Sequence, residues 1–360
     1  MTQVARSSPQ SACNHFRELI VAMFSEFDSR KIPFLVLRNY ETLPDLTSND
    51  VDVLVRPGDG DAAMEAVRVS ADATGWAVSH TGRYSCFSVF LFRPDTFEQT
   101  HVDLMLGNRW HSMVFADHAA MLDARRPVRG FYAPAKADEA WIDFATRMLY
   151  HGYVKRKYRP RIQSICTEDR DAAEAVFSRF LGKKLAGTVV GLCSAGDWGK
   201  AESLRWRVRF RVFLKNAANP IGFAARIGTD AVRFLDRFFN PVGLCVGLSG
   251  RSQEWRDSVA EILMHDFAGT FSPKKTFRFG NANRDGEPLS TPWNNVFHGG
   301  LSILDLPDDK SGSGRCDMVF SEKPDQDPRI LCPPAAPELR PFVLSAVFGF
   351  LKKRTESRHA

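Results

Sequence analysis

The chain has few cysteines and none of the cysteine patterns that hold a structural metal. Its seven cysteines are scattered over 360 residues without a Cys-X-X-Cys pair. An odd number of cysteines at irregular spacing is typical of reduced, mostly buried thiols in a cytosolic protein. The pattern therefore argues against a structural zinc site.

Long apolar segments are also missing. No stretch approaches the roughly 20 apolar residues that a membrane-spanning helix needs. Residues 1–10 are polar and lack the apolar core of a secretory signal. These absences predict a cytoplasmic protein. Peripheral contact with the inner face of the membrane stays an open alternative.

Composition bounds the class of protein and of partner. The hydrophobic content of 44% and the charged content of 25% are ordinary for a globular protein, and 360 residues favour two or three domains. The net charge of +6 and the pI near 9.0 favour acidic partners. Nucleotides, polyphosphates, nucleic acid and an anionic membrane surface all fit this charge.

Two aspartates inside an apolar run carry the main chemical signal. The run is Asn49-Asp50-Val51-Asp52-Val53-Leu54-Val55, and in a strand Asp50 and Asp52 would project from the same face. A second apolar run, residues 99–106, is interrupted by Asp103. If the two strands pair, the three carboxylates can hold two Mg²⁺ (or Mn²⁺) ions about 3.5–4 Å apart. The alternative is a strand end with solvated aspartates.

These motifs resemble the polymerase-β-type nucleotidyltransferases, which carry Asp-X-Asp (X apolar) on one strand and a third carboxylate on a later strand. Leu37-Arg38-Asn39-Tyr40-Glu41-Thr42-Leu43-Pro44, then Asp50-Val51-Asp52, then His101-Val102-Asp103-Leu104 is similar to a bacterial subgroup. That subgroup is fused to a thymidylate-kinase-like domain and often associated with surface-polysaccharide gene clusters. Over residues 12–135 the resemblance implies a small mixed sheet with helices, a nucleoside triphosphate substrate, and metal ligands at the three aspartates.

The chain departs from the superfamily just before the aspartates. A Gly-Gly or Gly-Ser pair is usual there and lets the backbone approach the triphosphate, whereas this chain has Arg38-Asn39. An arginine can hold phosphate by its charge instead. We therefore count Arg38 and Asn39 among the candidate substrate-binding residues.

Further cationic candidates follow the third carboxylate. Arg109 comes directly after the strand that carries Asp103, a position suited to ligand contact or to a structural role. A run of cations at residues 155–161 includes Lys155 and Lys157. We interpret it either as a solvated face or as an electrostatic platform for a triphosphate or an acidic acceptor.

The middle region is predicted to be helical. Trp141, Phe144, Ala145, Met148 and Leu149 form one apolar stripe, and residues 200–240 are rich in arginine and aromatic residues. The favoured interpretation is packing of these basic helices between domains with their arginines in water. The alternative is adsorption to an anionic membrane surface.

Residues 241–360 predict a degenerate P-loop domain of α/β type. A buried strand runs into a glycine-containing turn and an amphipathic helix, and Gly247 and Gly250 lie in this segment. Against Gly-X-X-X-X-Gly-Lys-Ser/Thr, Ser252 replaces the second glycine and Gln253 replaces the lysine that holds the β- and γ-phosphates. We expect no kinase activity from this segment. Residues 280–313 are predicted to form a loop, and residues 325–329 weakly resemble a downstream motif of the thymidylate-kinase-like family.

The sequence therefore predicts an α/β protein with three domains: a nucleotidyltransferase-like domain (1–135), a helical domain or linker (136–240) and a degenerate thymidylate-kinase-like domain (241–360). The predicted function is Mg²⁺-dependent transfer of a nucleoside monophosphate from a nucleoside triphosphate to a hydroxyl or phosphate acceptor, with surface polysaccharide as the family context. The acceptor is a small molecule, a sugar or a protein. The alternative is a catalytically inactive nucleotide-binding or scaffold protein. Sequence-specific nucleic-acid binding is not expected, because no groove-reading motif is present.

Overall fold

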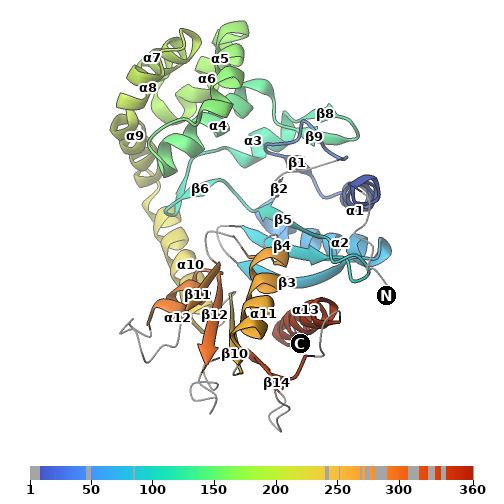
Figure 1. Cartoon of the computed structure of the whole chain (residues 1–360). Coiled ribbons are helices and arrows are strands. Elements are labelled where there is room, and N and C mark those ends of the chain that lie inside the picture. Colours follow the sequence, from blue (N-terminus) through green and yellow to red (C-terminus); the bar gives the residue numbers. More distant parts are fainter. Residues whose placement is uncertain are drawn as a thin grey trace. The chain divides into compact units, whose positions relative to one another are not determined.

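The computed structural model describes residues 9–45, 50–83, 86–239, 243–250, 252–267, 270–271, 276–279, 290–306, 316–322, 329–333 and 338–359. The chain divides into two compact units (Figure 1). Unit 1 comprises residues 1–74, 84–87 and 102–232, and unit 2 comprises residues 75–83, 88–101 and 233–360. The helices and sheets confirm the expected α/β class. The division into three domains stays a prediction, and the motif at residues 325–329 falls almost wholly outside the described residues.

The first sheet is mixed and has the strand order β1-β2-β5-β4-β3. The bounds are β1 Phe34–Val36, β2 Val51–Val55, β3 Ala77–Arg83, β4 Phe87–Phe92 and β5 Gln99–Met105. β1 runs antiparallel to β2, and β2 runs parallel to β5. A parallel pair requires a long crossover, and the segment between β2 and β5 supplies it. The strands predicted from the apolar runs are confirmed.

One helix precedes β1 and another follows β2. They are α1 (Pro9–Ser29) and α2 (Gly60–Ala73), the latter preceded by the 3₁₀ turn η1 (Pro57–Asp59). The apolar side chains of α1 recur at helical spacing and are buried: Leu19, Ile20, Met23, Phe24 and Phe27. Phe24 stacks on Phe34 of β1 with the ring centroids 5.1 Å apart. α1 therefore contributes directly to the core that supports β1.

Short elements connect β5 to the helical region. β6 (Arg109–Trp110) pairs with β7 (Met113–Val114), and β8 (Arg126–Val128) pairs with β9 (Phe131–Ala133). Between these two ribbons lies α3 (His118–Asp123). Arg109, the cationic candidate after β5, thus begins a small ribbon of its own.

The helical region predicted from the sequence is confirmed. Its elements are α4 (Lys136–Tyr150), η2 (Arg156–Tyr158), α5 (Arg159–Glu168), α6 (Arg170–Leu181), α7 (Lys183–Ser194), α8 (Trp198–Ser203), α9 (Arg205–Ala217) and α10 (Pro220–Phe239). The apolar stripe of α4 is fully buried. Trp141 stacks on Phe180 of α6 at 5.2 Å, and its Nε1 donates to the carbonyl of Phe115 at 2.7 Å. α4 is therefore held firmly in the core of unit 1.

The second sheet lies in unit 2 and is parallel, with the order β11-β12-β10-β13-β14. Its strands are β10 (Leu244–Ser249), β11 (Thr276–Phe279), β12 (Leu301–Leu306), β13 (Met318–Ser321) and β14 (Ile330–Leu331). The helices that accompany it are α11 (Gln253–Asp266), α12 (Ser290–Phe297) and α13 (Leu339–His359). β10 is central, and the chain passes to β12 on one side and to β13 on the other, which is a topological switch point.

The prediction of a loop over residues 280–313 is wrong for its described part. Residues 290–306 contain α12 and β12, and β12 pairs with β10 along its whole length. Strand β12 is buried except at the half-buried Asp305, but Ser302 and Asp305 interrupt its apolar residues. This short, interrupted apolar pattern is easily overlooked between neighbours rich in glycine, asparagine and serine.

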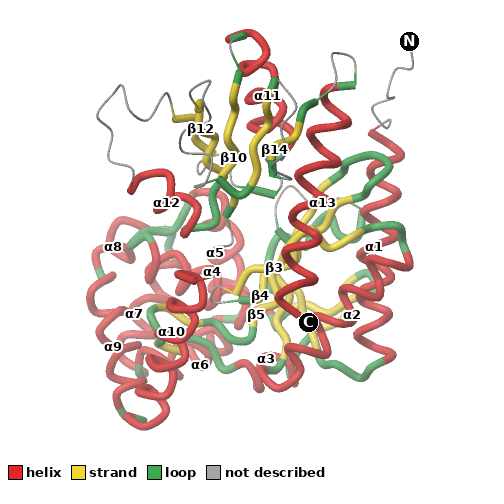
Figure 2. The backbone as a smooth tube through the Cα atoms, turned by 90° about the horizontal axis from the view of Figure 1, so that it is seen from below, coloured by secondary structure: helices red, strands yellow, loops and turns green. Residues whose placement is uncertain are grey.

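The C-terminal helix α13 runs alongside β3 (Figure 2). Phe348 stacks on Phe92 of β4 with centroids 4.1 Å apart, and Thr355 Oγ1 donates to the carbonyl of Ser79 at 3.2 Å. Within the described ranges, no helix combines the length and apolar character needed to cross a bilayer.

Candidate functional site

The pairing of β2 with β5 decides which polar side chains meet. Val51 pairs with Val102, and Asp52 pairs with Asp103. Asp50, one residue before β2, therefore lies opposite His101 in the continuation of the same register. The pairing expected from the sequence is confirmed, and side chains two apart on a strand share a face.

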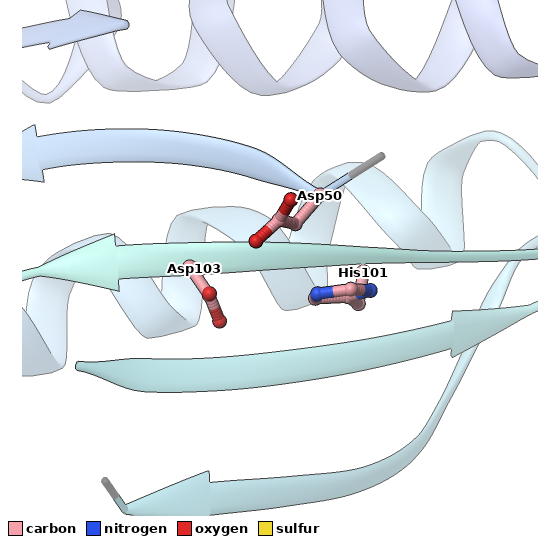
Figure 3. A group of neighbouring side chains, drawn as sticks. All are labelled: Asp50, His101 and Asp103. Carbon is pink, nitrogen blue, oxygen red and sulfur yellow. The ribbon is translucent and has the colours of Figure 1, made fainter. Parts of the chain in front are cut away.

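A group of three side chains at this place can hold a metal ion (Figure 3). Asp50, His101 and Asp103 are half-buried, and each offers one ligand atom within 4.8 Å of the others. Carboxylate oxygens suit Mg²⁺ and Mn²⁺, and an imidazole nitrogen suits later transition metals such as Zn²⁺. This donor set fits a divalent cation. The sequence prediction included Asp50 and Asp103 but missed His101, whose signal was its position two residues before Asp103.

Asp52 is held by an arginine. Its carboxylate accepts two hydrogen bonds from Arg38, from Nε at 2.6 Å and from Nη2 at 3.1 Å. Asp52 is only 1% exposed. Burial raises the pKa of the Asp52 carboxyl, and the Arg38 guanidinium opposes that rise. Asp52 therefore lies beside the three-residue group with its charge already compensated, and its role as a metal ligand stays a prediction.

Asn39 keeps a backbone conformation that glycine commonly supplies. Its φ of 56° lies in the left-handed region, which asparagine tolerates better than most residues. Asn39 follows Arg38, whose guanidinium lies next to the carboxylate of Asp52.

A pocket of about 270 Å³ opens beside Asp52 and Asp103. Its polar lining includes Arg38, Arg109, Arg147, Tyr150 and His151, and its apolar lining includes Leu37, Met105, Phe115 and Ile142. The volume is slightly below the usual range for drug-sized ligands. Two carboxylates facing several guanidinium groups in one concavity suit a small, highly charged ligand.

The helical wall of the pocket comes from α4, which the sequence analysis did not connect with the site. Arg147 Nη2 donates to the hydroxyl of Tyr158 at 2.6 Å, and Tyr150 donates to the carbonyl of Arg109 at 2.6 Å. These bonds fix both side chains and tie α4 to β6. The only signal in the sequence was the one-turn spacing of Ile142, Thr146 and Tyr150.

The cationic run 155–161 is divided between ion pairs and solvent. Lys155 and Lys157 are exposed and do not line the pocket. Arg159 pairs with Glu202 at 2.9 Å, and Arg161 pairs with Glu139 at 2.8 Å. Exposure of the two lysines fits both the solvated face and the electrostatic platform, and their substrate contact stays a prediction.

A buried acid lies one turn along α4 from Glu139. Asp143 is 2% exposed, and Arg161 Nη1 lies 3.7 Å from its Oδ2. Burial first, and the charge of Glu139 second, raise the pKa of Asp143 to about 7. The positive charges of Arg147 and Arg38 act against this rise. Asp143 is therefore a carboxyl whose charge changes near neutral pH, close behind the pocket wall.

A glycine and a histidine shape the exit from β5. Gly107 has a φ of 143°, and a Cβ there would lie 2.7 Å from Cε1 of His118. The backbone NH of Asn108 donates to His118 Nε2 at 2.5 Å, so this nitrogen is an acceptor and the ring is neutral. Burial, with a contribution from Arg109, lowers the pKa of His118 to about 4.

The candidate P-loop residues of unit 2 lie between β10 and α11. Gly247 is inside β10, paired with Leu304 and Val319. Ser252 caps α11 by accepting from Trp255 NH at 3.2 Å, and its own NH donates to Glu322 Oε2 at 3.3 Å. Gln253 Nε2 donates to Asp257 at 2.7 Å. A protein carboxylate therefore lies at the helix N-terminus where a P-loop holds phosphate. That this loop is a degenerate P-loop stays a prediction.

Comparisons with known proteins give one structural likeness. No protein-family model matches the chain, and no curated protein matches it. A solved structure from H. pylori, which carries a provisional assignment as a nucleotidyltransferase, aligns with 58% of this chain and 96% of its own length. The sequence identity is 10% and the TM-score is 0.27.

Proposed function

We propose that this protein is a divalent-metal-dependent nucleotidyltransferase that transfers a nucleoside monophosphate from a nucleoside triphosphate to a hydroxyl or phosphate acceptor. The observation that carries the proposal is the parallel pairing of β2 with β5, which sets Asp50 and Asp52 against His101 and Asp103. Polar groups that converge beside a concave pocket are the general signature of a small-molecule site.

The residues divide into two roles. Asp50, Asp103 and His101 would hold the metal, and Asp52 would join them if Arg38 releases it. A bound divalent ion would supply Lewis-acid stabilisation of the triphosphate and a lowered pKa of the acceptor hydroxyl. Arg38, Arg109 and Arg147, which line the pocket together with Asp52 and Asp103, would bind the phosphate oxygens by charge and hydrogen bonds.

The reaction is an in-line displacement at the α-phosphorus. The acceptor oxygen forms a bond to the α-phosphorus, the bond to the bridging oxygen breaks, and pyrophosphate leaves. The proton of the acceptor hydroxyl passes to a carboxylate oxygen of Asp103. The arginines of the pocket offset the negative charge that accumulates on the leaving pyrophosphate.

One observation favours a second candidate function. The bidentate Arg38–Asp52 pair satisfies a carboxylate that the reaction would use, as expected for a protein that binds nucleotide without turnover. In this alternative the protein is an inactive nucleotide-binding or scaffold protein. It would then belong to a system that assembles surface polysaccharide, without catalysing a step itself. Turnover separates the two candidates.

The test combines binding with transfer. Each of the four common nucleoside triphosphates is titrated with Mg²⁺ or Mn²⁺ on the native protein and on the Asp50→Asn and Asp103→Asn variants. Transfer is measured with α-phosphate-labelled nucleotide and a panel of sugars, sugar phosphates and the protein itself as acceptors. Asp123→Asn, an exposed carboxylate on α3, is the matched control.

We expect metal-dependent nucleotide binding and transfer in the native protein and in the control, and their loss in both site variants. Metal-dependent binding without transfer to any acceptor would favour the inactive alternative. Absence of metal-dependent nucleotide binding under all conditions would overturn both candidates.

A further inference from the structure

Helix α9 carries apolar side chains on two opposite sides. Val208 and Val212 are fully buried and attach the helix to the body of unit 1. Trp206 and Phe210, on the other side, are 66% and 59% exposed. Phe213 and Leu214 continue this exposed side at the next turn. A surface helix normally presents charged or polar residues there, so this second apolar side needs an explanation.

Helix α10 also exposes apolar side chains to solvent. Two of its polar side chains, Arg226 and Asp230, face the protein. Arg226 donates to the carbonyl of Ser112 at 3.0 Å and to Asn216 Oδ1 at 3.0 Å. Asp230 accepts a hydrogen bond from the hydroxyl of Ser112. Ile221, at 83% exposure, and Ile227, at 50%, lie on the solvent side of the helix. The favoured sequence interpretation, packing of these helices between domains, stays a prediction.

The two apolar surfaces meet at the turn between the helices, which follow one another along the chain (Figure 1). Phe213 of α9 contacts Phe223 of α10 with ring centroids 6.3 Å apart. Phe223 is one helical turn before Ile227. We call the exposed set Trp206, Phe210, Phe213, Leu214, Ile221 and Ile227 the α9–α10 face.

The charged side chains of the segment that carries this face have one sign. Residues 203–229 contain no aspartate or glutamate. Arg205, Arg207 and Arg211 of α9 are exposed, whereas the ammonium of Lys215 donates to the carbonyl of Arg179. Arg207 and Arg211 lie one turn apart along one flank of the apolar side chains. The face therefore combines a bulky apolar strip with a cationic border.

This combination identifies the partner by its chemistry. A nucleic acid would use the cations and aromatic rings but offers little contact for aliphatic side chains such as Leu214, Ile221 and Ile227. An anionic bilayer uses all of them, since bulky apolar groups enter the headgroup–acyl boundary while arginines and lysines bind lipid phosphates.

We propose that the α9–α10 face docks on an anionic lipid bilayer and holds the protein at a membrane surface. This inference goes beyond the proposed function, since it concerns α9 and α10 and needs neither metal nor nucleotide. The aromatic and aliphatic side chains insert, and the cationic border binds the phosphate groups of the lipids.

The first test is co-sedimentation of the full-length protein with vesicles of phosphatidylcholine containing about 30% phosphatidylglycerol, at about 0.1 M and about 0.5 M NaCl. Vesicles of pure phosphatidylcholine are the neutral comparison. We expect sedimentation with the anionic vesicles at low salt, strong reduction at high salt, and little with neutral vesicles. Equal recovery in the supernatant with and without vesicles would overturn the proposal.

Two double variants assign the binding to this face. Phe210→Ser with Ile221→Ser removes apolar groups, and Arg207→Ser with Arg211→Ser removes border charges. Each pair should weaken partitioning by about 10- to 30-fold. The controls are Val21→Ser, which changes a 46% exposed side chain on α1, and Lys184→Ser, which changes an exposed cation on α7. Control variants that lose binding as strongly as the test variants would contradict the assignment.

Other occupants of the face are distinguished in the same samples. Light scattering in the absence of lipid would reveal a dimer that Phe210→Ser dissociates, which would assign the face to a second copy of the chain. A short DNA duplex is added as a competitor. If the duplex displaces the protein from vesicles, and the affinity for DNA is unaffected by Phe210→Ser and Ile221→Ser, the cations bind nucleic acid. Either result would overturn the lipid proposal.

Discussion

Asp52 of β2 lies directly opposite Asp103 of β5 in a parallel pairing. Neighbouring strands are about 4.8 Å apart, so two carboxylates on one face at this separation repel each other unless cations compensate them. Arg38 compensates Asp52. Asp103 belongs instead to the group with Asp50 and His101 that fits a divalent ion.

The Asp103→Asn variant tests that assignment of charges. It keeps the shape of the side chain but removes a negatively charged ligand, so we expect the affinity for Mn²⁺ to fall by at least about 100-fold. Isothermal titration calorimetry without nucleotide measures this directly. The control variant Asp123→Asn should bind Mn²⁺ with the affinity of the native protein, because Asp123 is not part of the group of Asp50, His101 and Asp103. Equal affinity in Asp103→Asn and the native protein would exclude Asp103 as a ligand.

Removing Arg38 should destabilise the fold. Arg38→Ala leaves the Asp52 carboxylate buried without its partner, and such a loss typically costs about 3–5 kcal/mol of unfolding free energy. Arg38→Lys should cost less, because it keeps the charge but loses the bidentate geometry. Urea denaturation at neutral pH measures both. The double variant Arg38→Ala with Asp52→Asn should recover part of the loss, whereas a single-variant cost below about 1 kcal/mol would contradict the role of the pair.

Asp143 predicts a pH dependence of stability with a definite sign. Its pKa is about 7 in the folded protein and about 3.9 in an unfolded chain. Between these values the folded state retains a proton that the unfolded state has lost. The free energy of unfolding should therefore decrease as the pH rises from about 4 to about 7, by at most about 1.4 kcal/mol per pH unit.

Asp143→Asn removes this contribution and should be more stable than the native protein at about pH 8. Urea denaturation at about pH 5 and about pH 8 gives the comparison, with Asp123→Asn as the exposed control. The pH slope of the native protein should exceed that of Asp143→Asn, and identical slopes would count against the assignment.

Unit 2 should lack nucleoside-monophosphate kinase activity. Gln253 stands where a P-loop needs a lysine, and the Glu322 carboxylate accepts from the NH of Ser252 at the start of α11. A negative side chain at this position repels the phosphates that the loop would bind. A coupled assay for nucleoside diphosphate formation checks this. Turnover that disappears in Gly247→Val would contradict the prediction.

The sequence predicted the parts of the site that depend on one strand at a time. Asp50 and Asp103 stand out because carboxylates interrupt apolar runs, and the period of two along a strand fixes their face. His101 shares that period with Asp103. It was missed because a histidine within a strand is not distinctive until the facing strand supplies Asp50.

The remaining features depend on tertiary relationships that local pattern does not contain. Arg38 and Asp52 are 14 residues apart, and their pairing requires the β1–β2 register. Arg147 and Tyr150 line the pocket because α4 is rotated so that this side faces the β-ribbon. β12 was missed for a different reason: its apolar run is short, and Ser302 and Asp305 interrupt it.

The bend at Gly107 links the residue type at this position to His118 and to the shape of the neighbouring pocket. Only glycine tolerates both its left-handed backbone and the imidazole ring that occupies the space of a Cβ. The same bend carries the backbone from the carboxylate strand to the arginine-bearing pocket wall. In a collection of distant relatives, glycine here paired with histidine eleven positions later should therefore mark chains that retain this corner of the pocket.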